Sequence, residues 1–276
     1  MTTVTDPSRS FALGGDVNNP FVAWQNLGAA ATLGGTAVLT GGERANAVSG
    51  STYDKWRPDV STTEAILSFD FGTATSISFA ALAAHNAYSH AATVVVERSS
   101  DGTTWVDGGA GSITPTDNNV MAWRMVAQSY RYWRFKFTGL TASDALSVGV
   151  AFLGNDLVIP RRFYQGFSPV ITPTEVQLQS NVSVGNELLG SSVIGSGSTL
   201  SAQIGNIEPA FIRGADWVAF QRAFGTGAGF FFGWRPAKYP QDVYYCARSG
   251  GVIRPDNSGP RDLMSVAIEA RVYGHD

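Results

Sequence analysis

The chain contains little cysteine and no long apolar run, and each shortage excludes a class of protein. Among its 276 residues there is one cysteine, Cys246, so no internal disulfide can form and no metal site can be built from several thiols. Cys246 lies in Asp242–Arg248, a segment typical of a strand, and we expect a buried structural thiol. No segment approaches the ~18 consecutive apolar residues of a membrane helix. We therefore expect no membrane insertion.

The N-terminal segment also lacks the features of an export signal. Met1 is followed by polar residues, with neither the basic start nor the apolar core that signal peptides carry. We expect the chain to be synthesised in the cytoplasm and not to be exported by a signal peptide.

Charge is scarce as well, and this limits the partners that the surface can attract. Only 15% of the residues are charged, and the formal net charge is −3. Phosphate contacts need clustered lysine and arginine, so the sequence predicts no nucleic-acid binding. A weakly charged surface fits a protein whose faces are covered by partners. It equally fits a glycine- and threonine-rich β-protein with a neutral surface, and composition leaves both open.

What the chain does contain is apolar and aromatic sequence divided by glycine. Hydrophobic residues make up 44% and aromatic residues 12%, and there are 31 glycines. This composition is typical of many short strands joined by tight turns. We divide the chain into an N-terminal arm (residues 1–35), a β-sandwich (36–158) and a small α+β assembly domain (159–276). Prolines 160, 169 and 173 follow the second boundary and interrupt regular structure there.

The central region predicts a series of strands and no helix. In Arg131–Phe137, residues Trp133, Phe135 and Phe137 alternate with polar neighbours, which places them on one face toward a core. Strands separated by turns and without a convincing helix indicate a β-sandwich. The expected strands are Ala65–Gly72, Thr75–Ala84, Ala92–Arg98, Asn119–Ala127, Arg131–Phe137 and Ala145–Leu153.

The C-terminal region predicts one helix packed on an antiparallel sheet. Glu208–Phe224 has helical spacing and ends before Gly225, a residue suited to close a helix. Asn186–Thr199 is rich in glycine and serine, and we expect a long loop or an exposed hairpin there. The remaining expected strands are Val176–Val184, Phe230–Trp234, Asp242–Ala247 and Leu263–Val272.

Four segments of the central region carry a resemblance to a known family. They are Tyr53–Pro58, Ala65–Gly72, Val94–Trp105 with its Ser-Asp-Gly turn, and Tyr130–Phe135. In this order they resemble the discoidin family, also called F5/8 type C or the galactose-binding-like jelly roll. The turn has a physical role of its own, since Asp101 can accept hydrogen bonds from following backbone and Gly102 tolerates positive φ. Asp70 lies inside a strand and needs a cationic partner if it is buried. We expect that partner to be Arg131 or Arg134.

The discoidin resemblance implies where a ligand would bind. Members of this family bind ligands on loops at one end of the jelly roll, with aromatic rings stacked on sugars and polar side chains beside them. The corresponding loops here are Thr52–Arg57 and Asn86–His90. In the alternative interpretation Trp56 fills the mouth of the barrel, and the two histidines are ordinary surface residues. The expected glycan-binding residues are Tyr53, Trp56, Arg57, His85, Tyr88 and His90.

The C-terminal region resembles tail-tip proteins of siphovirus-like phages. The segments that carry this looser resemblance are Asp216–Phe224, Gly229–Pro236 and Asp262–Tyr273. Together with the discoidin-like unit they suggest a distal-tail-like protein of the tail tip or baseplate. We therefore expect a structural component of a tailed-phage virion, forming a homo-oligomeric ring that contacts the tail tube, hub and fibres.

No catalytic motif is present, and we expect no enzyme activity, cofactor or metal. The chain has no His-Glu-x-x-His pair, no Gly-x-Ser-x-Gly elbow and no phosphate-binding Gly-Lys-Ser loop. Two other functions stay open beside the virion role. One is a carbohydrate-binding module for host attachment. The other is a glycan-processing enzyme, for which two of Glu64, Asp70 and Glu97 would have to meet in space.

Overall fold

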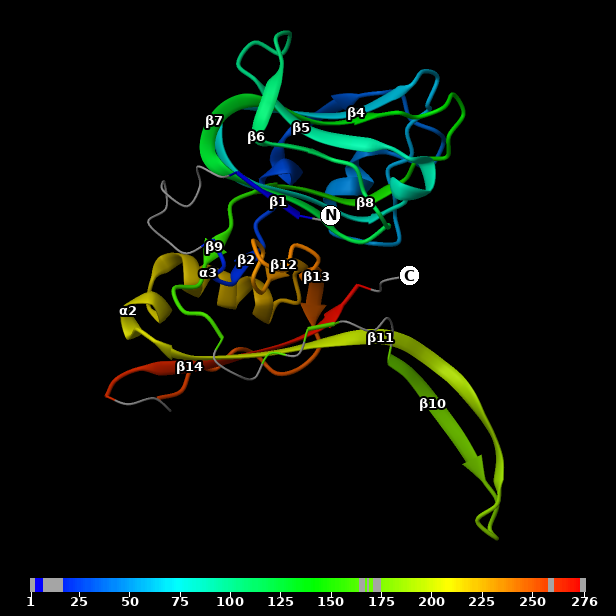
Figure 1. Ribbon diagram of the computed structural model, residues 1–276, viewed down its shortest axis with the longest axis vertical. Helices are drawn as coiled ribbons and strands as arrows, with labels where there is room; N and C mark the ends of the chain where they lie inside the picture. The colour runs from blue at the N-terminus through cyan, green and yellow to red at the C-terminus, as the bar shows by residue number, and fades with distance from the viewer. Residues whose placement is uncertain are drawn as a thin grey trace.

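The computed structural model describes residues 3–6, 17–163, 167, 169–170, 175–257 and 261–273. The fold is mainly β: a jelly-roll unit lies against a second sheet that carries two α-helices (Figure 1). The elements of the jelly roll are β1 (Thr3–Thr5), η1 (Leu27–Ala30), β3 (Thr32–Gly35), η2 (Arg44–Val48), β4 (Glu64–His85), η3 (Tyr88–His90), β5 (Thr93–Ser99), β6 (Val106–Ile113), β7 (Met121–Thr138) and β8 (Val148–Gly154).

Two long bent strands build both layers of the jelly roll. The first half of β4 pairs with the second half of β7, from Glu64 opposite Thr138 to Asp70 opposite Tyr132. After a register shift between Asp70 and Thr75, the second half of β4 pairs with the first half of β7. Strands β3, β5 and β6 extend one layer, while β1 and β8 extend the other. The prediction of a mainly β fold that begins with a jelly-roll β-sandwich is confirmed.

The alternation predicted for Arg131–Phe137 holds in β7. Trp133, Phe135 and Phe137 are fully buried in the core between the layers. On the opposite face, cations pair with carboxylates across the strands: Arg134 Nε lies 2.6 Å from Glu97, and Lys136 Nζ lies 2.9 Å from Glu64. Arg131, and not Arg134, is the partner of Asp70, through two hydrogen bonds of 2.7 and 2.8 Å.

The turn after β5 has the capped geometry that its sequence predicts. Asp101 Oδ1 accepts hydrogen bonds of 2.8 Å from the backbone N–H groups of Thr103 and Thr104. These donors hold the pKa of Asp101 well below its usual range. Gly102 has a φ of +76°, which glycine adopts without strain. The turn brings Trp105 beneath the guanidinium of Arg134, 4.1 Å from the ring centroid.

The second sheet has the order β10-β11-β14-β13-β12-β2-β9. One helix was expected over Glu208–Phe224, but the structure has two, separated at Arg213 and Gly214. Gly214 N–H donates to Phe211 O at 3.0 Å, which closes α2, and the extended backbone of Gly214 then starts α3. The elements are β2 (Phe21–Ala23), β9 (Leu157–Val158), β10 (Glu175–Val182), β11 (Leu188–Ile207), α2 (Pro209–Ile212), α3 (Ala215–Gly225), β12 (Phe230–Gly233), β13 (Val243–Arg248) and β14 (Met264–Val272).

Segments from both sides of the jelly roll enter the second sheet. Strand β2 lies within residues 1–35, which we expected to form an arm, yet it pairs with β12 and β9 inside this sheet. Strand β9, which includes the expected domain boundary at residue 158, pairs with β2. Residues that precede the sandwich and residues that follow it therefore form neighbouring strands at one edge of the second sheet. The chain connects the two units at both of these places.

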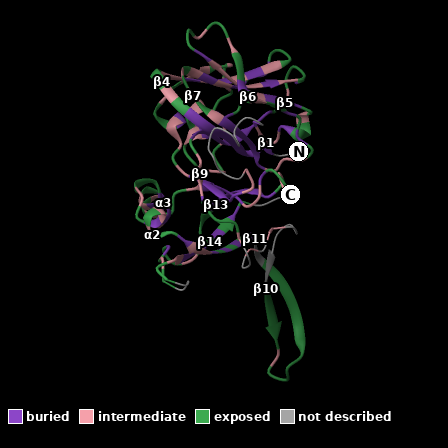
Figure 2. Cartoon of the chain, turned by 60° about the vertical axis from the view of Figure 1, so that its left-hand side comes forward, coloured by how far each residue is buried: buried purple, intermediate pink, exposed green. Residues whose placement is uncertain are grey.

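A layer of aromatic side chains fills the seam between the units. Phe79 from β4 is fully buried, and its ring centroid lies 5.3 Å from that of Phe21 and 5.7 Å from those of Phe152 and Phe231. The second half of β4 is consequently buried on both faces, as the continuous buried stretch in Figure 2 shows. A sheet covered on both sides needs apolar residues at consecutive positions, and β4 has them from Phe79 to Ala84.

Replacing Phe79 by alanine should loosen the seam. We expect Phe79→Ala to lower the free energy of unfolding by about 3–5 kcal/mol, because it leaves a cavity among three aromatic rings. Denaturant unfolding, followed separately by signals from each unit, should then show two transitions. Phe69→Ala, in the jelly roll's own core, is the matched control and should destabilise without separating the transitions. A small loss with one transition in Phe79→Ala would contradict this account.

The Asp70–Arg131 pair predicts an acid-dependent contribution to stability. The hydrogen bonds from Arg131 lower the pKa of Asp70 to about 2. Because the folded pKa lies below the unfolded value of about 3.9, the contribution is present above pH ~4 and is lost as the pH falls toward 2. An NMR titration of the Asp70 carboxyl group should find a midpoint near pH 2 in the wild type and a higher midpoint in Arg131→Met. Lys136→Met should leave it unchanged, and a wild-type midpoint near 4 would overturn the assignment.

Candidate functional site

Two of the six residues expected to bind a glycan lie in the interior. Trp56 is fully buried, 5.9 Å from the ring of Phe137, so it fills the jelly roll and cannot stack on a sugar. His85, the last residue of β4, is 4% exposed, and burial lowers its pKa to about 4. Its Nδ1 accepts a hydrogen bond from Ala87 N–H at 3.3 Å. Both residues therefore leave the candidate set, because a ligand cannot reach them.

The other four expected residues lie on the surface, but only two present free aromatic faces. Tyr53 is 91% exposed and Tyr88 is 52% exposed. Arg57 donates to Thr40 O at 2.8 Å and is directed to a neighbouring loop. His90 lies between Asn86 and Asp144, at 3.2 Å from each.

Strand β8 brings the two loops that carry these tyrosines together. Val148 forms a bridge with Trp56 and is also opposite His85 in the pairing of β4 with β8. Tyr53 and Tyr88 therefore lie on loops that meet at the start of β8.

The carboxylates considered for glycan processing do not meet one another in the structure. The three carboxylates considered for glycan processing, Glu64, Asp70 and Glu97, each face a cation rather than one another. Within the described ranges, no group of three His, Cys, Asp or Glu side chains could hold a metal ion. In the same ranges no helix has the length and apolar character needed to cross a membrane.

A group of exposed apolar side chains lies on a hairpin that leaves the body of the protein. From Ser198 to Ile207, β11 pairs with β14 in the second sheet. Before Ser198, β11 pairs only with β10, so this two-stranded ribbon projects away from both units (Figures 1 and 2). At its tip Ser183 N–H donates to Glu187 O, and Asn186 N–H donates to Ser183 O, each at 2.9 Å. The tip is thus a hydrogen-bonded turn.

Apolar side chains along this hairpin lack cover from the rest of the chain. Isolated two-stranded hairpins are marginally stable in water, and a contiguous apolar patch marks an interaction site. Between residues 179 and 193 the only charged residue is Glu187. The sequence predicts a strand followed by a long loop or exposed hairpin here, and loops of this kind commonly reach neighbouring subunits in tail-tip proteins. The exposed fractions are Val182 52%, Val184 111%, Leu188 72%, Leu189 68% and Val193 63%.

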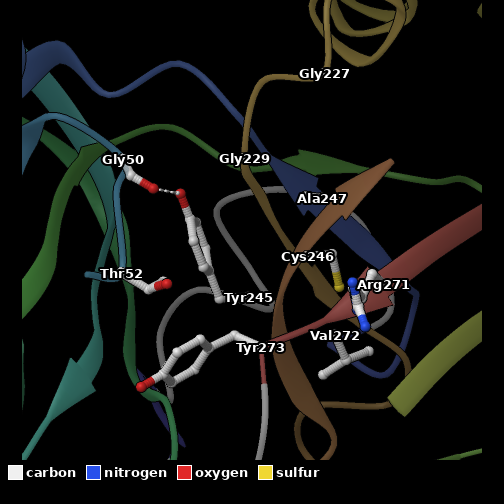
Figure 3. Close-up of a pocket in the computed structure, with 10 residues that line it drawn as sticks. All are labelled: Gly50, Thr52, Gly227, Gly229, Tyr245, Cys246, Ala247, Arg271, Val272 and Tyr273. Carbon is white, nitrogen blue, oxygen red and sulfur yellow. Dashed lines mark hydrogen bonds between the residues drawn. The ribbon is translucent and has the colours of Figure 1, made fainter. Parts of the chain in front are cut away.

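A pocket lies at the seam between the jelly roll and the second sheet (Figure 3). Its volume is about 270 Å³. Tyr245 crosses the seam and donates a 2.8 Å hydrogen bond to Gly50 O, and among the described lining residues Arg271 alone is charged. Burial raises the pKa of Tyr245 to about 12 and raises that of the Cys246 thiol strongly, so both stay protonated at neutral pH. The lining residues are Gly50, Thr52, Gly227, Gly229, Tyr245, Cys246, Ala247, Arg271, Val272 and Tyr273.

The jelly roll is similar to solved carbohydrate-binding modules. Chitosan-binding module 1 of a chitosanase/glucanase from Paenibacillus sp. IK-5 is 18% identical, with a TM-score of 0.41 over 48% of this chain and 99% of the module. Module 2 of that enzyme, solved with chitotriose, is 18% identical, with a TM-score of 0.41 over 47% of this chain and all of the module. No protein-family profile matches the chain, and no curated protein is similar to it in sequence.

Proposed function

We propose that this protein is a structural subunit that assembles through its projecting hairpin. The observation that carries the proposal is the exposure of several apolar side chains on β10, β11 and the turn between them, with Val184, Leu188 and Leu189 at and beside the tip. Burying apolar surface contributes roughly 25 cal/mol per Å², and the ribbon exposes such surface on a support that is only marginally stable alone. A neighbouring protein that covers the hairpin would both order it and gain that free energy.

The assembly that we propose is the tail tip or baseplate of a tailed-phage virion. The resemblance of residues 216–224, 229–236 and 262–273 to tail-tip proteins supports this assignment. In such a setting the second sheet and its hairpin would join a homo-oligomeric ring and the adjoining tube, hub or fibres. The jelly roll, on the opposite side of the molecule from the hairpin tip, would face outward (Figure 1).

Polar substitutions on the hairpin should abolish self-association. We expect the wild type to show a mass above that of one chain in light scattering at high concentration, and Leu188→Ser with Leu189→Ser to return it to a monomer. Both side chains are exposed, so folding should change by no more than about 0.5 kcal/mol. Leu39→Ser, an exposed leucine on the jelly roll, is the control and should leave the mass unchanged. A wild type that stays monomeric at every concentration contradicts the proposal.

Glycan contact at a cell surface is a second candidate function, favoured by the exposure of Tyr53 and Tyr88. Exposed aromatic faces on neighbouring loops are a suitable platform for stacking on sugar rings, whose C–H faces are apolar. This role is compatible with a structural one, because the two surfaces lie at different places on the molecule.

Removing the two rings tests this second role. On a glycan array, Tyr53→Ala and Tyr88→Ala should each weaken any saturable binding by at least about tenfold, while Tyr53→Phe, which keeps the ring face, should retain it. Far-UV circular dichroism should show that folding is unaffected. Saturable binding that survives the loss of both rings would exclude these loops as the site.

A further inference from the structure

We propose that the hairpin tip of one copy docks into the seam pocket of a second copy, with Glu187 meeting Arg271. This inference rests on the proposed function and names the surface that receives the hairpin. The two partners in it are the tip segment, Val184 to Leu189, and the pocket that holds Arg271.

The pocket is the size of one or two side chains and not of a whole ligand. At about 270 Å³ it is smaller than the ~300–1,000 Å³ of pockets that enclose drug-sized molecules, so a docked segment would insert a side chain or two and lay the rest of its surface over the rim. Its walls include Val272, Ala247 and the ring of Tyr245, with glycines at 50, 227 and 229. Figure 3 shows Arg271 and Val272 on the second-sheet side and Thr52 on the jelly-roll side. Apolar walls around one cation favour an apolar segment that carries one acid.

The hairpin tip has this complementary chemistry. Glu187 is the single charge between residues 179 and 193, and it is flanked by Val184, Leu188 and Leu189. Among the described residues neither the Glu187 carboxylate nor the Arg271 guanidinium forms an ion pair. One acid set in an apolar tip therefore matches one cation set in an apolar pocket, and pairing them on association would satisfy both charges.

The geometry requires the pocket to belong to another copy. The ribbon extends from the second sheet in the direction away from the seam, so its tip lies away from the pocket of its own chain (Figure 1). The tip and the pocket are different surfaces, so the contact can repeat from copy to copy as a heterologous contact. Heterologous contacts close into rings when the rotation between neighbours allows it. This agrees with the ring that the proposed function invokes.

A charge-reversal series on the full-length chain tests the pairing. Glu187→Arg and Arg271→Glu should each weaken self-association at least about tenfold in sedimentation equilibrium, since each places like charges together. The double variant should recover most of the loss, because it restores opposite charges in reversed order. Asp59→Arg, an exposed acid on the jelly roll, is the matched control for the change in net charge and should have little effect.

The outcomes separate this inference from the function on which it rests. Rescue in the double variant supports the docking. Association that depends on Leu188 and Leu189 but not on Arg271 overturns the docking and leaves the assembly role standing. A wild type that never associates overturns both. Circular dichroism of each variant excludes misfolding as the cause, since both charged side chains lie on the surface.

Discussion

The packing of Phe79 against Phe21, Phe152 and Phe231 is the interaction on which the arrangement of the molecule depends. These rings come from both units, and all four are buried. A buried ion pair supports them: Arg124 and Asp156 are 1% and 0% exposed and 3.0 Å apart, and Arg124 also lies 4.5 Å above the ring of Phe21. Removing one member of such a pair leaves an uncompensated charge and costs about 3–5 kcal/mol. The seam therefore holds the two units in one orientation.

That orientation determines what the surface can do. The seam covers the outer face of one jelly-roll layer, which leaves the other layer and the loops at the start of β8 accessible. The hairpin consists of β10 and the first half of β11. The second half of β11 is held in the second sheet by its pairing with β14. A rigid seam consequently fixes the direction in which the hairpin points. A subunit that must reach a neighbour at a set distance and angle needs such a support, since a flexible joint would add an entropic cost to association.

Much of the jelly roll could be predicted from sequence because its signals are local. Strand alternation in Arg131–Phe137 and the turn at Asp101 and Gly102 each depend on a few neighbouring residues. Burial of Trp56 and His85 could not be predicted in the same way, since it depends on strands distant in the chain. The pairing of Arg124 with Asp156 likewise joins residues 32 positions apart. The sequence does not indicate that the expected helix breaks at Gly214. A glycine stands there, but the apolar residues on both sides of it keep helical spacing.

The central claim is that a rigid body presents the hairpin as its contact for assembly. Hydrogen exchange of the backbone amides, compared between dilute and concentrated protein, tests this most directly. The account predicts that amides in Val182–Val193 exchange fast in dilute solution, where the ribbon is uncovered, and become protected at high concentration. Amides in the first halves of β4 and β5, away from the seam and the hairpin, should exchange equally in both. Hairpin amides that exchange at the same fast rate at every concentration would contradict the account.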